Sequence, residues 1–225
     1  MSATTRTVIH LATLGFALLA GLPAQASSIQ MDTRYYAGKV LGSAAAYKST
    51  IDALVTAAPT SGYGDASLAG FNSVSNHAQF GSSTNIAFRY EVDFSANSAG
   101  TWNFRIGPDF GLGGAVFLDG ITEAFKTNDM WWNGSYGTAS QNLSFSANLA
   151  AGNHSLLIYG LEACCDGSQQ AQFKAPGALV FTSFSTQDGH APVAADIGHV
   201  PEPGSLPLAC TALLGLLAGQ RKWAA

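Results

Sequence analysis

The chain has 225 residues, only 11% of them are charged, and its formal net charge is −4 at pH 7. This length suits one β domain with sorting segments at its ends. The abundance of Gly, Ser, Ala and Asn is more typical of an extracellular β protein than of a helical enzyme. The sequence has no basic patch, which argues against nucleic-acid binding, and its acidity suits solubility outside the cell.

Residues 1–26 are predicted to be a secretory signal peptide. Arg6 gives the positive start, residues 8–22 give the apolar run, and Ala24 and Ala26 give a small-x-small cleavage site. A buried helix would need polar residues at helical spacing, and the apolar run has almost none. We therefore expect cleavage directly after Ala26 and export of the rest of the chain.

The first part of the body carries one predicted helix. Residues 31–36 are a candidate first strand, and the alanine-rich residues 42–58 follow. Pro59 would end a helix there, because proline cannot continue the backbone hydrogen bonds. Residues 60–83 are rich in Gly, Ser and Asn and are predicted to be mostly loop. The apolar positions of the helix fall at helical spacing: Tyr47, Ile51 and Leu54.

Predicted strands dominate from residue 87 onward. Residues 87–94 and 101–106 alternate apolar and polar side chains, and the turn signals between them predict a hairpin. Residues 154–162 are apolar on both faces, which predicts a central, covered strand. The remaining candidate strands are residues 115–118, 121–125, 141–145, 169–173 and 178–184. Short strands at near-regular spacing predict a mainly β fold, a jelly-roll-like antiparallel β-sandwich, over residues 27–185.

The C-terminal end has the order of a sorting signal. Residues 186–199 are expected to be a linker, and residues 205–219 are apolar and uncharged before the basic Arg221 and Lys222. Before them stand Pro201, Glu202 and Pro203. This order resembles the PEP-CTERM sorting signal of Gram-negative bacteria, placed here at residues 200–225. The resemblance implies transient membrane insertion through the C-terminal helix, recognition by an exosortase, and delivery to the cell surface or extracellular matrix; a plain membrane anchor is the alternative.

One bend in the body has the composition of a ligand site. Within residues 101–120, a glycine-rich bend carrying Asp109 separates two strands, and Asp119 follows the second of them. The motifs of this region are Gly100-Thr101-Trp102-Asn103-Phe104, Phe117-Leu118-Asp119-Gly120 and Ala151-Gly152-Asn153-His154-Ser155-Leu156. They resemble the protective-antigen-type β-sandwich of adhesins, glycosidases and toxins. That family usually carries two adjacent aspartates in the bend, whereas this chain has only Asp109, preceded by Pro108.

Cys164 and Cys165 are adjacent in the sequence. Neighbouring Cα atoms lie about 3.8 Å apart, below the usual disulfide range of about 4.4–6.8 Å. A bond between them would make a tight turn with a flat surface for a ligand such as a sugar ring. Two free thiols and disulfides between chains are the alternatives. The run Cys164-Cys165-Asp166-Gly167 also resembles the CCXG family of PEP-CTERM proteins, which is defined by sequence and destination.

Other candidate ligand groups each have a simpler interpretation. Asp109, Asp119 and Asp166 are possible calcium ligands, the one cofactor that the sequence suggests, but aspartate before glycine also caps turns. Trp131 and Trp132 could stack on a sugar or plug the end of the sandwich. We favour turn capping for the aspartates and core packing for the tryptophans.

No catalytic motif accompanies these residues. The sequence contains no G-x-S-x-G or H-E-x-x-H run, and nothing selects a pair of carboxylates for glycoside hydrolysis. We therefore expect a non-enzymatic surface or matrix protein, structural or adhesive, associated with exopolysaccharide or biofilm. The alternatives are a calcium-dependent carbohydrate-binding module and a secreted hydrolase.

Overall fold

The computed structural model describes residues 27–190. The strands of one sheet are β1 (Ser28–Tyr35), β2 (Asp65–Ser67), β4 (Thr84–Ala96), β7 (Gly114–Leu118), β8 (Ile121–Lys126) and β11 (Gly152–Cys164). Those of a second sheet are β3 (Asn72–Val74), β5 (Gly100–Gly107), β10 (Leu143–Leu149), β12 (Gln169–Lys174) and β13 (Thr182–Ser183). The remaining elements are β6 (Asp109–Phe110), β9 (Met130–Trp131), α1 (Ala44–Val55), α2 (Asn76–Phe80) and the short 3-10 helix η1 (Ala139–Gln141).

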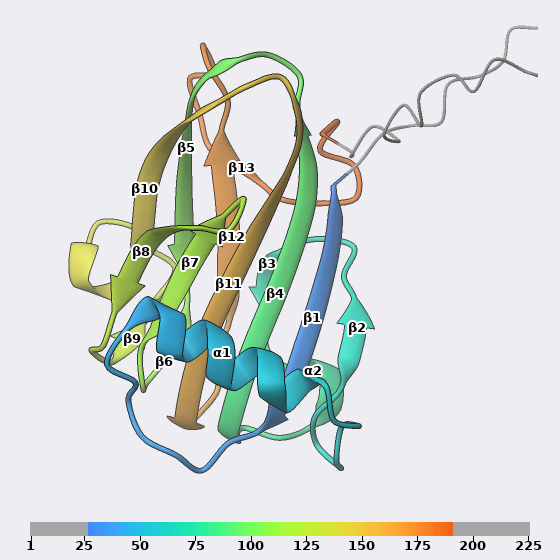
Figure 1. The fold of residues 1–225 in the computed structure, drawn as a ribbon, viewed down its shortest axis with the longest axis vertical. Coiled ribbons are helices and arrows are strands. Elements are labelled where there is room, and N and C mark those ends of the chain that lie inside the picture. The colour runs from blue at the N-terminus through green and yellow to red at the C-terminus, as the bar shows by residue number, and fades with distance from the viewer. Residues whose placement is uncertain (1–26, 191–225) are drawn as a thin grey trace, which may run out of the picture.

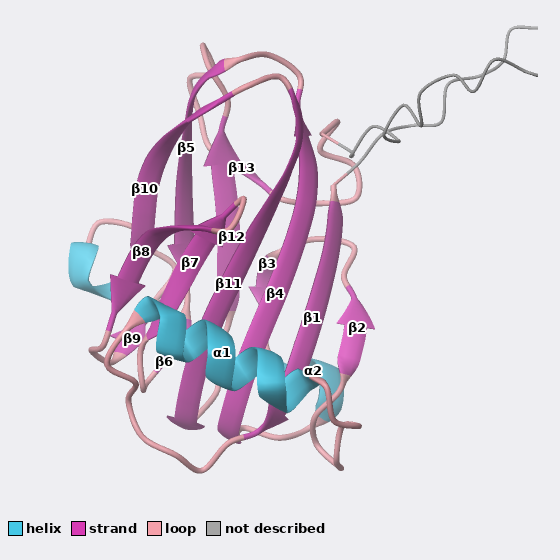
Figure 2. Cartoon of the chain, viewed as in Figure 1, coloured by secondary structure: helices cyan, strands magenta, loops and turns pink. Residues whose placement is uncertain are grey.

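The two sheets face each other and form an antiparallel β-sandwich (Figure 1). The first sheet has the order β2-β1-β4-β11-β7-β8, and the second has the order β10-β5-β12-β13 with β3 also paired to β12. A separate two-stranded pair, β6-β9, closes one end. The predicted mainly β fold is therefore confirmed, and helices are few (Figure 2). Residues 60–83, expected to be mostly loop, also contain β2, β3 and α2.

The two long strands β4 and β11 form the middle of the first sheet. In β4, Phe88, Tyr90 and Phe94 are fully buried between the sheets, while Arg89 and Glu91 point to the opposite face. This is the alternation expected from the sequence. β11 lies between β4 and β7, so the prediction of a central, covered strand is confirmed.

The predicted hairpin between the fourth and fifth strands is wrong. β4 pairs with β1 and β11, whereas β5 pairs with β10 and β12 in the other sheet. The chain crosses from one sheet to the other, so the apolar faces of the two strands meet across the core. The ring of Phe94 lies 5.9 Å from the rings of both Trp102 and Phe104. Alternation identifies the face that a strand buries, but it does not identify the neighbouring strand.

The predicted N-terminal helix is confirmed as α1, which crosses the outer face of the first sheet (Figure 1). Its first turn is capped by Ser43, whose Oγ accepts a hydrogen bond from the Ala46 amide at 3.1 Å. Tyr47 and Ile51 are fully buried against a second apolar cluster on this face. The cluster also contains Ala87, Ala115, Phe117, Tyr159 and Leu161.

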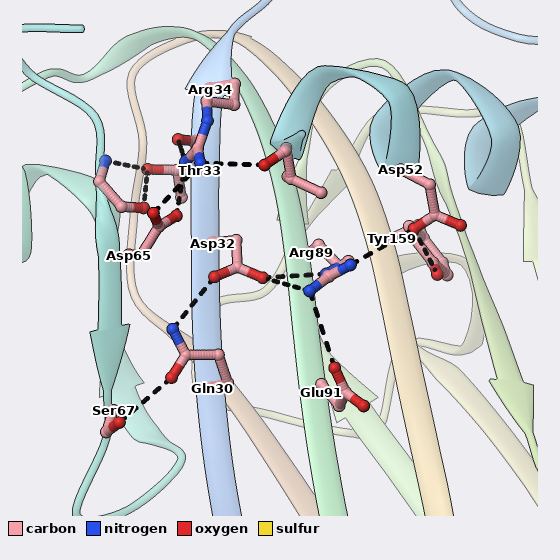
Figure 3. Close-up of polar contacts among 12 residues, drawn as sticks. Gln30, Asp32, Thr33, Arg34, Asp52, Asp65, Ser67, Arg89, Glu91 and Tyr159 are labelled. Atoms are coloured by element: carbon pink, nitrogen blue, oxygen red, sulfur yellow. Dashed lines mark hydrogen bonds and ion pairs between the residues drawn. The ribbon is translucent and has the colours of Figure 1, made fainter. Parts of the chain in front are cut away.

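Ion pairs and hydrogen bonds lie on this outer face beside α1 (Figure 3). Arg89 donates to Asp32 at 2.9 Å and lies 3.7 Å from Asp52 of α1. Arg34 pairs with Asp65 at 2.5 Å, and its own side chain is almost buried. The two arginines of this face are therefore paired with carboxylates.

The domain extends beyond its predicted boundary at residue 185. Asp188 accepts hydrogen bonds from the amides of Ser27 and Ser185, at 3.2 and 3.0 Å. The ring of His190 meets the buried ring of Trp102 edge-on at 5.2 Å. Residues 186–190 are therefore part of the domain and not of the expected linker.

The other predictions for the two ends lie outside the described residues. They are the signal peptide, the remainder of the linker and the sorting signal with its apolar helix. Within residues 27–190, no helix has the length and apolar character needed to cross a membrane.

Candidate functional site

The two adjacent cysteines form an exposed turn at the end of the central strand. The structure joins Cys164 to Cys165 in a disulfide, with their Cα atoms 3.8 Å apart. Both residues are exposed, and Cys165 adopts a positive φ of 75°. The disulfide turn therefore lies at the surface of the domain.

A cavity of about 440 Å³ lies beside this turn. It is bounded by the end of β11, the bend after β5 and the two-stranded pair β6-β9, in which Asp109 stands opposite Trp131. Its lining residues are Asp109, Gly111, Asp129, Trp131, Glu162, Ala163, Cys164 and Cys165. The cavity thus combines an aromatic ring, a disulfide and three carboxylates.

Two of these carboxylates are nearly buried and held by backbone amides. Asp109 is 5% exposed and accepts a hydrogen bond from the Gly167 amide at 2.5 Å. Glu162 is also 5% exposed, and it accepts from the amides of Gly111 and Cys164 at 2.5 and 2.8 Å. The amides therefore fix both carboxylates relative to the disulfide turn.

Burial raises the pKa of these acids. Loss of hydration, together with the nearby Asp166 and Asp129, raises the pKa of Asp109 to about 6, against the opposing effect of the Gly167 amide. Burial also raises the pKa of Glu162, against the effect of its amide donors. At neutral pH the cavity is therefore acidic, and each negative charge disfavours the others.

Asp166 directly follows the disulfide turn in the sequence, and its side chain connects the turn to α2 by a hydrogen bond. Its Oδ2 accepts from the His77 amide at 2.8 Å, while its Oδ1 is buried with no hydrogen-bond partner among residues 27–190. Burial raises its pKa to about 6. Asp166 and Asp109 influence each other electrostatically, so these two predicted ligands do lie in one region.

Asp119, the third possible calcium ligand, lies apart from Asp109 and Asp166. It lies at the β7–β8 turn with a positive φ of 50°, in a different cavity of about 330 Å³. Its carboxylate contacts His154 Nδ1 at 2.7 Å and accepts from the Ser155 amide at 3.0 Å. Asp119 thus caps a turn, as the simpler interpretation held. Among residues 27–190, no group of three or more His, Cys, Asp or Glu side chains is arranged to hold a metal ion.

The two tryptophans have different environments. Trp131 is 64% exposed, so the expectation that it packs in the core is wrong. Pairing with the short strand β6 at the end of the sandwich places it at the cavity instead of between the sheets. Trp132 is half-buried, covers Gly107 and lies 5.5 Å from the ring of Tyr136. Trp132 therefore packs against the domain, while Trp131 is available to a ligand.

Sequence reasoning did not nominate Glu162 or Asp129. Glu162 carried a usable signal, because it is a carboxylate at the end of the apolar strand predicted at residues 154–162, two residues before the cysteine pair. Burying a charge there requires a partner or a function. Asp129 had no such signal, because its approach to the cavity depends on the pairing of β9 with β6.

The raised pKa values predict how stability depends on pH. Between about pH 4 and pH 6 the folded state holds protons on Asp109 and Asp166 that the unfolded state has released. These two groups should therefore make the free energy of unfolding fall as the pH rises through that window and level off above it. Denaturant titrations from pH 4 to pH 7 on wild type and the double variant Asp109→Asn, Asp166→Asn measure this. We expect the variant to gain stability relative to wild type as the pH rises, and a constant difference would contradict the assignment.

Comparison with solved structures finds similar adhesin and PA14 domains at low sequence identity. No protein-family model matches the chain, and neither does any curated protein. A PA14 sugar-binding domain from an RTX adhesin is 21% identical, with a TM-score of 0.49, covering 75% of this chain and 99% of that one. The PA14 domain of the antifreeze protein MpAFP is 13% identical, with a TM-score of 0.46, over 72% of this chain and 88% of that one.

A third structure is the A domain of epithelial adhesin 9 from Candida glabrata, in complex with Galb1-3GlcNAc. It is 10% identical, with a TM-score of 0.44, over 73% of this chain and 88% of that one. At these identities and scores, the similarities assign no ligand to this chain.

Proposed function

We propose that the protein is an extracellular adhesive protein and that the cavity at the disulfide turn binds a carbohydrate. The observation that carries this proposal is the exposed ring of Trp131 in one cavity with the Cys164–Cys165 disulfide and fixed carboxylates. A sugar ring has apolar C–H faces and hydroxyl edges. A site that offers both an apolar surface and hydrogen-bond acceptors suits both features.

Each group has a distinct role in this proposal. Trp131 supplies the flat aromatic surface for a pyranose face, and the disulfide supplies a second apolar surface. Asp109 and Glu162 accept hydrogen bonds from sugar hydroxyls with the oxygen capacity that their backbone donors leave unused. Because the amides already hold these carboxylates, little side-chain entropy is lost when the sugar binds.

Calcium is not required by this arrangement. Calcium prefers six to eight oxygen ligands, and the carboxylates of Asp109 and Glu162 already accept backbone hydrogen bonds. Among the carboxylate oxygens of residues 27–190, Asp166 Oδ1 is the one that is buried without a hydrogen-bond partner. We therefore expect sugar binding to persist in a chelator, and chelator-sensitive binding would instead support the calcium-dependent alternative.

The proposed location outside the cell rests on the two ends of the sequence and on the disulfide. The predicted signal peptide would direct export, and disulfides persist in oxidising compartments. The order of Pro201, Glu202 and Pro203 before an apolar run supports sorting by an exosortase and release to the cell surface or matrix. A protein in that location would encounter extracellular polysaccharide, which is therefore the partner that we propose.

A glycan array with and without chelator tests the proposal on the chain comprising residues 27–190. Saturable binding to a defined glycan is the expected result. Failure to bind any glycan would favour a purely structural role. Release of reducing ends from a bound glycan, abolished by Glu162→Gln, would favour the hydrolase.

The disulfide should matter to binding more than to folding. Replacing both Cys164 and Cys165 by serine removes an exposed turn constraint, so we expect glycan affinity to fall by about tenfold through lost preorganisation. The melting temperature should change little, because neither side chain lies in the core. Intact mass of protein purified from its host should show two hydrogens missing relative to the reduced chain. A host protein with two free thiols would contradict this role.

A further inference from the structure

The strands of the second sheet differ in charge from the chain as a whole. Strands β5, β10, β12 and β13 contain no Asp or Glu, although acidic residues outnumber basic ones by 14 to 10 in the whole chain. Arg105 and Lys174 are the two cations of these strands. Arg105 of β5 stands opposite Gln172 of β12, so Lys174 lies diagonally across the strand pair from it. Positive charge is therefore concentrated on these strands, away from the acidic cavity at the disulfide turn.

The guanidinium of Arg105 is fixed between two aromatic rings. Its Cζ atom lies 4.1 Å from the centre of the Tyr136 ring and 3.9 Å from that of Phe181. Its Nε donates to Gln172 Oε1 at 2.6 Å. Lys174 Nζ lies 5.2 Å from the centre of the same Phe181 ring, so both cations lie beside one aromatic side chain.

Arg105 has no acidic partner within residues 27–190, unlike the other described arginines. Arg34 pairs with Asp65, and Arg89 pairs with Asp32. The contact with Gln172 uses the Nε of Arg105 and leaves its Nη1–Nη2 edge, which matches the two oxygens of a carboxylate. Because two rings and Gln172 already hold the group, a carboxylate would meet an arginine that is oriented before binding.

The surroundings of Arg105 suit a ligand rich in hydroxyl groups. A groove of about 390 Å³ contains Arg105 and is lined also by Asn103, Tyr136, Ser144, Ser146 and Phe181. Ser144 and Ser146 are exposed on β10, next to β5. The backbone of β5 is paired on both sides, with β10 and β12, so a peptide cannot add to it as a further strand.

We propose that this groove is a second binding site, which recognises the carboxylate of a uronic acid unit in an acidic polysaccharide. Arg105 donates two hydrogen bonds to the carboxylate through its Nη1–Nη2 edge. Lys174 attracts a neighbouring acidic unit, and the serine hydroxyls form hydrogen bonds with sugar hydroxyls. The site goes beyond the cavity at Trp131 and does not depend on it, because the two share no lining residue.

Calorimetry with hexagalacturonate and its methyl ester on the chain comprising residues 27–190 tests the site. The acid should bind, and the ester, which lacks the charge but keeps the sugar rings, should bind at least about tenfold more weakly. This comparison uses wild-type protein and needs no variant to fold. Equal affinity for acid and ester would overturn the proposal.

Variants then locate the carboxylate. Arg105→Gln should lose about tenfold in affinity, and Arg105→Lys should recover only a small part, because lysine lacks the planar fork. Lys39→Gln removes the same charge from an exposed loop residue and should stay within about twofold of wild type at moderate salt. A full rescue by lysine, or an equal loss in Lys39→Gln, would show diffuse charge attraction and overturn the site.

Two further measurements separate this site from its alternatives. The Nε–Hε NMR signal of Arg105 in wild type should shift with hexagalacturonate, which covers the case in which Arg105→Gln is unstable. Trp131→Ala should bind hexagalacturonate normally; loss of binding would place the uronate in the first cavity and overturn the second site. Tighter, Arg105-dependent binding of polyglutamate would overturn the assignment to a polysaccharide.

Discussion

Trp131→Ala is expected to weaken binding of the array-selected glycan by about 2 kcal/mol or more, which is roughly thirtyfold in Kd. The ring is 64% exposed in the cavity that also contains the disulfide and the fixed carboxylates, so its removal takes away the flat surface for the sugar. The stability of the fold should change by less than about 0.5 kcal/mol, because the side chain lies outside the core. Titration calorimetry gives the affinity, and denaturant unfolding gives the stability.

Ile121→Ala is the matched control for this variant. Ile121 is 66% exposed and begins β8, and it does not line the cavity. The control should bind glycan as wild type does. If both variants bind normally, the cavity is not the sugar site. If Trp131→Ala unfolds the protein, the ring has a structural role that its exposure does not indicate.

Part of this site could be predicted from sequence because its residues are local. Asp109 stands in the glycine-rich bend, and Cys164 and Cys165 are adjacent, so each motif was visible on its own. Their approach was not visible, because it depends on β6 pairing with β9 and on β11 ending beside them. The contact between Glu162 and the bend was not visible for the same reason, although the position of Glu162 in the sequence was a usable signal.

The same limit applies to the fold. The spacing of Tyr47 and Ile51 predicted α1, and alternation in β4 predicted its buried face, because both signals depend only on nearby residues. The partner of β4 depends on residues far away in the chain, such as Leu156 and Ile158 of β11. The predicted hairpin with β5 was wrong for this reason. Two strands with apolar faces can be neighbours in one sheet, or they can lie in opposite sheets with those faces packed together across the core.

One contact connects the core to the cavity. Gly160 of β11 stands opposite Gly114 of β7, and the ring of Phe110 lies against both. Phe110 is fully buried and lies 5.5 Å from the ring of Phe88. Because Phe110 follows Asp109 directly, the two glycines make room for the ring that anchors the bend.

Gly160→Ala is therefore expected to damage both stability and binding. An added methyl group at residue 160 would overlap the ring of Phe110, which is enclosed by the core and cannot move aside freely. Overpacking of this kind costs about 1–3 kcal/mol. A domain of this size loses roughly 2–4 °C in Tm per kcal/mol. Displacement of Phe110 should also move Asp109 and lower glycan affinity in the molecules that stay folded.

Gly42→Ala provides the control, because an added Cβ at residue 42 meets nothing within 4 Å. Its Tm and glycan affinity should match wild type, since it tests the substitution without the clash. The double variant Gly160→Ala, Phe110→Leu gives a sharper test, because a smaller side chain leaves room for the methyl group. Partial recovery of Tm in the double variant, relative to Gly160→Ala, would show that the clash with this ring is the cause. The opposite result is that the double variant loses more unfolding free energy than the two single variants lose when their losses are added. In that case the glycine is required for another reason, such as the geometry of β11 itself.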